Sequence, residues 1–145
     1  MPASILGVWN LVSIVYVSGP EMTTIDPALP GLFIFTKNHY SVTWMPLQKQ
    51  QEDYADLWHP SDSEKVQSYN SIVTNTGSYV LSKTELVTSV EVAKTPAFIG
   101  GKAIYACELG KDELRLEVLD TLANDGTRDE SYLKFKTILK LQRIE

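Results

Sequence analysis

Cysteine, histidine and positive charge are all scarce in this sequence. The only cysteine, Cys107, has no partner for an internal disulfide, and His39 and His59 share no metal-ligand spacing with it. The sequence has 13 Lys and Arg and 18 Asp and Glu, which gives a net charge of -5. Because nucleic acids and anionic membranes attract clustered positive charge, we expect neither as a partner. We also expect no metal site and no cofactor.

Long apolar runs and an early positive charge are absent as well. No stretch approaches the roughly 18 apolar residues of a membrane helix. The first basic residue is Lys37, and Asn10 and Ser13 interrupt the apolar opening, so we expect no signal peptide and a cytoplasmic protein. The length of 145 residues suits one domain over 1–145.

What the sequence does contain is a series of short alternating segments. In 6–18, Trp9, Ser13, Val15 and Val17 fall on one face of an extended chain, and the segment is rich in β-branched residues. The clearest alternation of apolar and lysine residues lies in 131–143. The predicted strands are 6–18, 31–37, 39–46, 77–83, 85–93, 102–109, 113–120 and 131–143.

Short and long connections alternate between these strands. The tight turns fall at 37–39, 83–84 and 110–112, whereas the long connections are 19–30, 47–76, 94–101 and 121–130. In an up-and-down antiparallel arrangement, alternate connections lie at opposite ends. The pattern therefore predicts an all-β, eight-stranded barrel with an open mouth and a closed floor, wide enough for one small ligand.

One long connection carries a helix signal. Ser61 and Glu64 have the spacing of a capping box, directly after Pro60. Val66, Tyr69 and Val73 follow at helical spacing, and Gly77 is suited to end the helix. We expect one or two short amphipathic helices between the third and fourth strands, lying over the mouth as a lid.

The two ends of the chain resemble those of the lipocalin and calycin superfamily. Gly7 and Trp9 form a glycine-x-tryptophan motif at the start of the first strand, and Arg143 ends the last strand. In that superfamily the motif sits at the closed end, and a basic residue packs over the indole. The resemblance implies a structural floor of Gly7, Trp9 and Arg143, and the loop pattern also puts Trp9 and Arg143 at that end. A cation stacked on an indole is a structural arrangement rather than a ligand site.

The resemblance is closest to the lipocalin-like domain family of bacteria and fungi. The segments GVWNLVS at 7–13, PGL at 30–32 and GSY at 77–79 match its pattern, and the resemblance covers essentially the whole chain. Many members carry a histidine in the fifth strand, where this chain has Thr88 and Ser89. Chemistry that depends on that histidine is not carried over.

If the face of Trp9 points inward, the barrel lining is aromatic and apolar with scattered hydroxyl groups. Such a lining is typical of small-molecule pockets, although the same side chains could instead fill a solid core. The predicted ligand-binding residues are Phe33, Phe35, Tyr40, Trp44, Tyr79, Thr88, Tyr105 and Phe135.

Catalytic residues are not identifiable from the sequence. The candidates are His59, a possible general acid or base in the lid, and the hydroxyl groups of Tyr79 and Tyr105. An exposed loop histidine is the simpler interpretation of His59. We therefore expect a carrier or sensor for a small apolar or aromatic molecule. A small cyclase or isomerase of a natural-product pathway is the alternative, and an apolar outer face on the first strand leaves a homodimer open.

Overall fold

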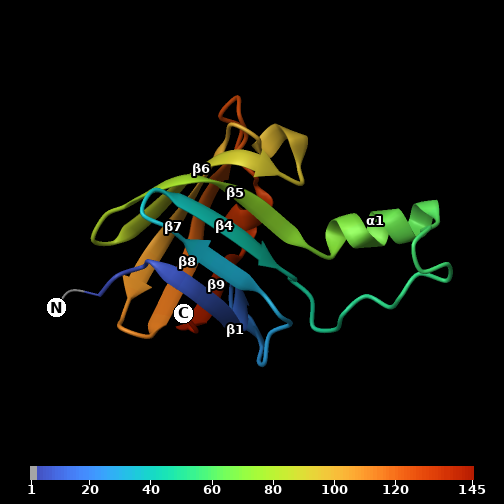
Figure 1. The fold of residues 1–145 in the computed structure, drawn as a ribbon, viewed down its shortest axis with the longest axis horizontal. Helices are drawn as coiled ribbons and strands as arrows, with labels where there is room; N and C mark the ends of the chain where they lie inside the picture. Colours follow the sequence, from blue (N-terminus) through green and yellow to red (C-terminus); the bar gives the residue numbers. More distant parts are fainter. Residues whose placement is uncertain (1–2) are drawn as a thin grey trace.

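A computed structural model describes residues 3–145, and the side chains of all of these except 132 and 133. Within them the chain forms an antiparallel β-barrel (Figure 1). Its strands are β1 (Gly7–Ser18), β2 (Glu21–Ile25), β3 (Leu32–Phe35), β4 (His39–Trp44), β5 (Val73–Leu81), β6 (Glu85–Ala93), β7 (Lys102–Leu109), β8 (Glu113–Leu122) and β9 (Lys136–Arg143). The helices are α1 (Asp62–Asn70) and α2 (Ser131–Lys134), with a 3-10 helix, η1 (Pro96–Phe98).

The barrel closes because β1 pairs with β9 as well as with β3. From β3 to β9 each strand pairs with the next along the chain. This confirms the predicted closed barrel of eight antiparallel strands. The largest differences from the predicted boundaries are in β5, which already begins at Val73, and in β9, where α2 occupies the start of the segment predicted as the last strand.

The additional strand, β2, was predicted to be part of a loop. It pairs with Ile14–Ser18 of β1, while Gly7–Asn10 of the same strand pairs with β3. Four of its five residues are exposed, and only Ile25 is buried. A short strand with this burial lacks an apolar face, and so it gives no alternation for sequence reasoning to detect.

The inner face of β1 changes parity within the strand. The pairing of β1 with β9 shifts register between Leu11 and Ser13, which is the effect of one extra residue in β1. Beyond this bulge the fully buried Ile14 faces Leu139 inside the barrel, whereas Val15 pairs with Ile138 on the outside. The prediction that Val15 and Val17 point inward was therefore wrong, because it assumed unbroken alternation.

The two ends of the barrel differ in the way that the loop lengths predict. The tight turns between β3 and β4, β5 and β6, and β7 and β8 lie at one end, together with the two ends of the chain. The backbone of Val8 bonds to Glu145 and Ile144 there, which anchors the last residues beside the first strand. The long connections 45–72, 94–101 and 123–135 lie at the opposite end, which is the mouth.

Gly7 is required by the approach of the chain end. Its φ is +128°, a conformation that residues with a side chain rarely adopt. A Cβ atom at this position would lie 2.2 Å from the backbone oxygen of Glu145. The glycine therefore allows the first and last segments to meet at the floor.

The predicted helix is present, but it does not cover the mouth. Ser61 caps α1, and both hydrogen bonds of the capping box with Glu64 are formed. The helix ends at Asn70, so Val73 and Gly77 belong to β5 instead. None of its residues is buried, and Figure 1 shows α1 extending away from the barrel.

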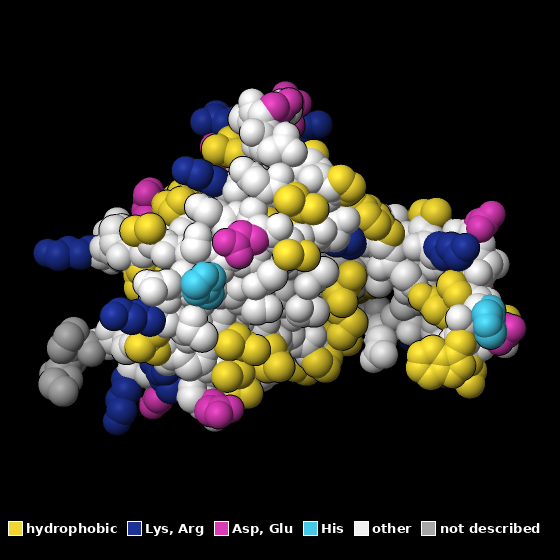
Figure 2. All heavy atoms as spheres, turned by 45° about the horizontal axis from the view of Figure 1, so that its top comes forward, with side chains coloured by type: hydrophobic (Ala, Val, Ile, Leu, Met, Phe, Trp, Pro, Cys, Tyr) yellow, Lys and Arg dark blue, Asp and Glu magenta, His cyan; other side chains and the backbone are white. Residues whose placement is uncertain are grey.

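We call residues 45–72 the arm. Figure 2 shows hydrophobic side chains on the surface of this projection, where Leu57, Trp58 and Val66 are all exposed. Trp58 is 87% exposed. Val66, which was expected to be part of the lid, therefore faces solvent, whereas Val73 packs against the core as part of β5.

Candidate binding site at the barrel mouth

A hollow of about 370 Å³ lies at the mouth of the barrel. The ends of β5, β6 and β8 form its inner wall, while η1 and the loop after β8 form its rim. Its lining residues are Val73, Thr74, Asn75, Ala93, Lys94, Thr95, Ala97, Phe98, Thr121, Ala123, Thr127, Arg128 and Asp129. The hollow is therefore a mixed apolar and polar site at the end of the barrel where the long loops gather.

The rim is held together by bonds between its two loops. The backbone of Asn124 donates to Ala97 (2.8 Å), and its side chain donates to Ile99 (3.3 Å). Gly101 lets these segments pack closely, since a Cβ there would lie 2.1 Å from the Leu122 oxygen. The two loops thus form a joined edge around the hollow.

A buried polar pair lies at the bottom of the hollow. The Tyr40 hydroxyl donates to Oδ1 of Asn75 over 2.6 Å, and the two residues are only 2% and 6% exposed. Thr88 lies beside them and exchanges hydrogen bonds with the backbone of Ala103 (3.3 and 3.4 Å). The mouth therefore connects through Asn75 to polar groups inside the barrel.

Burial controls the protonation of Tyr40. Desolvation raises its pKa to about 12, and Glu91 contributes in the same direction. A hydrogen bond with Thr88 opposes part of this shift in pKa. Tyr40 therefore remains a neutral hydrogen-bond donor at physiological pH.

The charged residues of the mouth are already partnered. Lys94 donates to the backbone oxygens of Tyr69 and Ile72 and lies 4.2 Å from the Tyr69 ring centre. Arg128 forms an ion pair with Asp120 at 3.1 Å, and Asp129 accepts two hydrogen bonds from Ser131. Lys94, Arg128 and Asp129 each already interact with a protein group, so a charged ligand would compete with these interactions.

The predicted ligand-binding residues lie deeper than this hollow. Phe33, Phe35, Tyr40 and Trp44 are buried in the hydrophobic core, and Thr88 is buried beside Tyr40. Tyr79 and Tyr105 are partly buried and pack against that core. Phe135 packs edge-on against Tyr16 and lines a separate hollow of about 400 Å³ near β2. Of these eight residues, Tyr40 touches the mouth site through its bond to Asn75.

The three candidate catalytic residues do not come together. His59 is exposed on the arm, where its Nδ1 lies 3.2 Å from Asp56. The hydroxyl of Tyr79 donates to the backbone oxygen of Thr36 at the closed end, and Tyr105 lies within β7. Burial raises the pKa of Tyr79. His59, on the arm, is thus separated from the two tyrosines, which lie on barrel strands.

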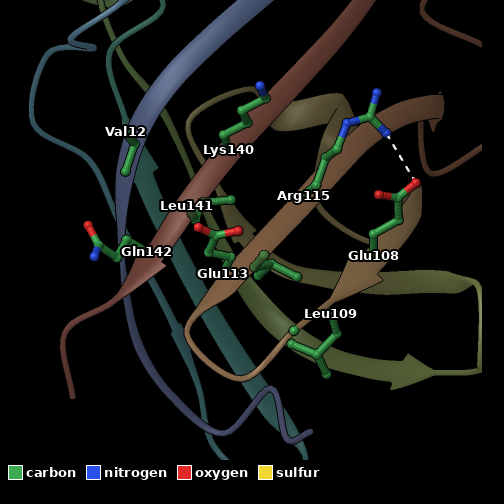
Figure 3. A pocket seen from close by; sticks show the side chains of 10 residues that line it. Val12, Glu108, Leu109, Glu113, Arg115, Lys140, Leu141 and Gln142 are labelled. Carbon is green, nitrogen blue, oxygen red and sulfur yellow. Dashed lines mark ion pairs between the residues drawn. The ribbon is translucent and has the colours of Figure 1, made fainter.

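A second hollow, of about 540 Å³, lies on the outer wall near the closed end (Figure 3). Its exposed side chains come from neighbouring strands, and Arg115 forms an ion pair with Glu108 at 3.6 Å. Lys140 pairs in register with Arg115 on the same wall, while the adjacent Leu114 and Leu141 point into the core. This surface is remote from the mouth and from the buried polar pair, so we favour the mouth as the binding site.

Sequence reasoning missed Asn75 and its neighbours because it assigned 47–76 to a connection. The alternating polar and β-branched residues from Val73 to Thr76 were the available signal for a longer β5. The residues of η1 and of the loop after β8 gave no such signal. Their contribution depends on the two loops meeting across the mouth.

Within residues 3–145, no group of three or more His, Cys, Asp and Glu side chains is arranged to hold a metal ion. No helix in the same residues is long and apolar enough to cross a membrane. Cys107 is a buried free thiol, and desolvation raises its pKa.

One comparison identifies the family of this chain. The profile of a family described as a lipocalin-like domain matches residues 6–143. No curated protein matches the chain significantly. A lipocalin-like protein from Bacteroides uniformis has a similar structure, with a TM-score of 0.47, 14% identity, and coverage of 97% of this chain and 98% of that one. An uncharacterized protein from Bacteroides eggerthii has a TM-score of 0.48 and 14% identity, with coverage of 97% and 100%.

Proposed function

This chain belongs to the lipocalin-like domain family, and from that premise we propose that it binds a small, uncharged and mostly apolar molecule at the mouth, as a carrier or sensor. The observation that carries the proposal is the hollow of about 370 Å³ above a buried polar pair. Small-molecule sites commonly enclose about 300–1,000 Å³ and combine apolar walls with a few placed polar groups.

The chemistry of the lining supports an uncharged ligand. Val73, Ala93 and Phe98 supply apolar surface, and their burial by a ligand contributes about 25 cal/mol per Å². Lys94 and Arg128 are engaged with protein acceptors, so a charged ligand would have to replace existing interactions. Desolvating a charge without a free partner is costly.

We do not propose the alternative cyclase or isomerase. His59 lies on the exposed arm, and the hydroxyl of Tyr79 donates to the backbone oxygen of Thr36. Acid-base chemistry needs its groups within hydrogen-bond reach of one substrate. Binding requires only the hollow and its lining.

The test uses N-phenyl-1-naphthylamine, an uncharged probe with a phenyl and a naphthyl group whose fluorescence rises in apolar surroundings. Ala93 points into the hollow and Val92, its neighbour on β6, is 61% exposed. Ala93→Phe should fill the hollow and weaken probe binding at least roughly tenfold, since it removes most of the apolar contact area. Val92→Phe adds the same ring on the outside of the same strand and should leave the affinity unchanged.

Thermal unfolding of both variants shows whether the barrel is intact. Equal probe affinity in the wild type and in a folded Ala93→Phe variant would contradict binding at the mouth. Absence of probe binding to the wild type would contradict the proposed function as a whole.

A further inference from the structure

Asn75 uses only part of its hydrogen-bonding capacity. Its Oδ1 accepts from Tyr40, but among residues 3–145 its Nδ2 group has no hydrogen-bond partner. Only 6% of the surface of Asn75 is exposed, and the residue lines the mouth hollow. Among the described residues, Thr137 Oγ1 is the fully enclosed side-chain atom that lacks a partner, so Nδ2 of Asn75 is not sealed off by protein atoms. Because Asn75 lines the hollow, this donor is accessible to a molecule bound there.

Tyr40 fixes the direction in which this amide points. A neutral tyrosine donates its proton to an amide oxygen, and burial keeps Tyr40 neutral. The oxygen of Asn75 is therefore held toward the barrel interior. The amide nitrogen, with its two hydrogens, occupies the other branch of the side chain and faces the hollow.

The position of Asn75 is also fixed by its backbone. It lies within β5, where it pairs with Val42 of β4 on one side and with Ala93 of β6 on the other. Val73 and Ala93 flank the amide with apolar surface along the same wall. The donor is thus held on regular strands rather than on a loop, which favours an oriented contact.

We propose that the ligand carries a carbonyl oxygen that accepts a hydrogen bond from Nδ2 of Asn75, while its apolar body packs against Val73, Ala93 and Phe98. The inference rests on the proposed function and adds the chemical class of the ligand: a neutral ketone, ester or amide. A carbonyl group suits the site because it accepts without bringing a donor of its own. An alcohol would add a hydroxyl hydrogen that needs another partner in the lining.

The test compares two probes with the same carbon skeleton, 2-acetylnaphthalene and 2-ethylnaphthalene. Their affinities are measured by displacement of N-phenyl-1-naphthylamine from the wild type and from Asn75→Leu, which has a similar shape but no donor. Because both proteins are compared with the same two probes, the ratio of the two affinities removes much of the effect that the change in hydrophobicity at position 75 has on both probes. We expect this ratio to fall by roughly fivefold in Asn75→Leu, the effect of one net hydrogen bond.

Asn38→Leu is the matched control, because it makes the same change in the tight turn between β3 and β4, at the closed end of the barrel. It should keep the wild-type ratio. If Asn75→Leu fails to fold, the wild type alone still gives an answer. The side-chain amide resonances of Asn75 should then shift in an NMR titration with 2-acetylnaphthalene and shift much less with 2-ethylnaphthalene.

The outcomes separate the two proposals. Binding of both probes with the same ratio in the wild type and Asn75→Leu would overturn the carbonyl inference and leave the proposed function in place. Equal shifts of the Asn75 amide with both probes would do the same. Failure of both compounds and of N-phenyl-1-naphthylamine to bind the wild type would overturn the proposed function and, with it, the inference.

Discussion

The guanidinium carbon of Arg143 lies 4.3 Å from the centre of the Trp9 ring, and the indole is fully buried. The guanidinium also donates from Nε to the backbone oxygen of Lys111 at 2.9 Å and from Nη1 to that of Leu6 at 2.5 Å. A third bond joins it to the backbone oxygen of Ser4. One side chain at the end of β9 thus links the indole, the segment before β1 and the turn between β7 and β8.

This relationship predicts a strong coupling between the two residues. Trp9→Ala should lower the free energy of unfolding by about 3–5 kcal/mol, because it removes a large buried ring. Arg143→Ala should cost less. The two losses should depart from additivity by at least about 0.5 kcal/mol, as expected for side chains in contact. Urea unfolding of the two single variants and the double variant measures the coupling.

Arg115 provides the control arginine for this comparison of single and double variants. It lies on the outer wall and forms an ion pair of 3.6 Å with Glu108. Arg115→Ala should change the free energy of unfolding by no more than about 0.5 kcal/mol and should add to Trp9→Ala. Simple additivity of Trp9→Ala and Arg143→Ala would show that the stacked contact contributes nothing in solution.

A second prediction concerns the glycine beside this contact. Gly7→Ala places a Cβ in a conformation with φ of +128° and 2.2 Å from the oxygen of Glu145. The backbone conformation alone should cost about 1–3 kcal/mol, and displacement of the chain end should add to it. Gly19→Ala is the comparison, because its φ of +56° is also positive but no atom lies within 4 Å of the added Cβ.

Urea unfolding should therefore rank the two glycine variants. Gly19→Ala should lose only about 1–2 kcal/mol from its backbone conformation. An equal or smaller loss in Gly7→Ala would mean that the last residues do not pack against Gly7 in solution.

The barrel could be predicted from the sequence because strand alternation and loop length are local properties. The capping box of Ser61 and Glu64 is local too, and it correctly located the start of α1. The bulge after Leu11 was not predictable in this way, since it arises from the pairing of β1 with β9 at the other end of the chain. One extra residue was enough to reverse the side on which Val15 and Val17 lie.

The candidate site was harder to predict for a related reason. Asn75 has no distinctive sequence context, and its role depends on Tyr40 from the neighbouring strand and on a hollow formed by two distant loops. The position of the helix along the sequence could be predicted, but its position relative to the barrel could not. Val66 and Tyr69 supply too small an apolar face to bind α1 to the barrel, and both are exposed.

A third prediction follows from the buried hydroxyl of Tyr40. Its pKa is raised from 10.0 to about 12, so the folded state holds this proton more tightly than the unfolded state does. The stability that depends on the protonated hydroxyl is complete below pH 10 and is lost as the pH rises toward 12. Between pH 10 and 12, the free energy of unfolding of the wild type should therefore fall relative to that of Tyr40→Phe.

Urea unfolding at a series of pH values measures that difference. Val42→Ala is the control, because it alters a buried residue of the same strand that does not titrate. The difference between the wild type and Val42→Ala should stay constant with pH. A difference between the wild type and Tyr40→Phe that is equally constant would contradict the raised pKa of Tyr40.

The last prediction concerns the arm. Hydrogen bonds of Ser68 with Tyr54 and Gln51 lie within the arm, and the arm contacts the barrel mainly near its two ends. Trp44 and Val73 are paired at its two ends, so a short turn can join β4 directly to β5. Replacing 47–71 by Asn-Gly should therefore leave a folded barrel with almost unchanged stability, because no residue of α1 is buried. Far-UV circular dichroism and urea unfolding measure both properties.

The same variant also shows whether the arm acts as a lid in solution. The arm touches the mouth through the hydroxyl of Tyr69, 2.9 Å from that of Thr95, and through the contacts of Lys94. These contacts lie at one edge of the hollow, so the affinity for N-phenyl-1-naphthylamine should change by only about twofold, in keeping with the small contribution of exposed contacts. A loss of tenfold or more in a folded variant would show that the arm closes over the bound probe. Unfolding of the variant would instead make the arm part of the core, which the exposure of Leu57, Trp58 and Val66 argues against.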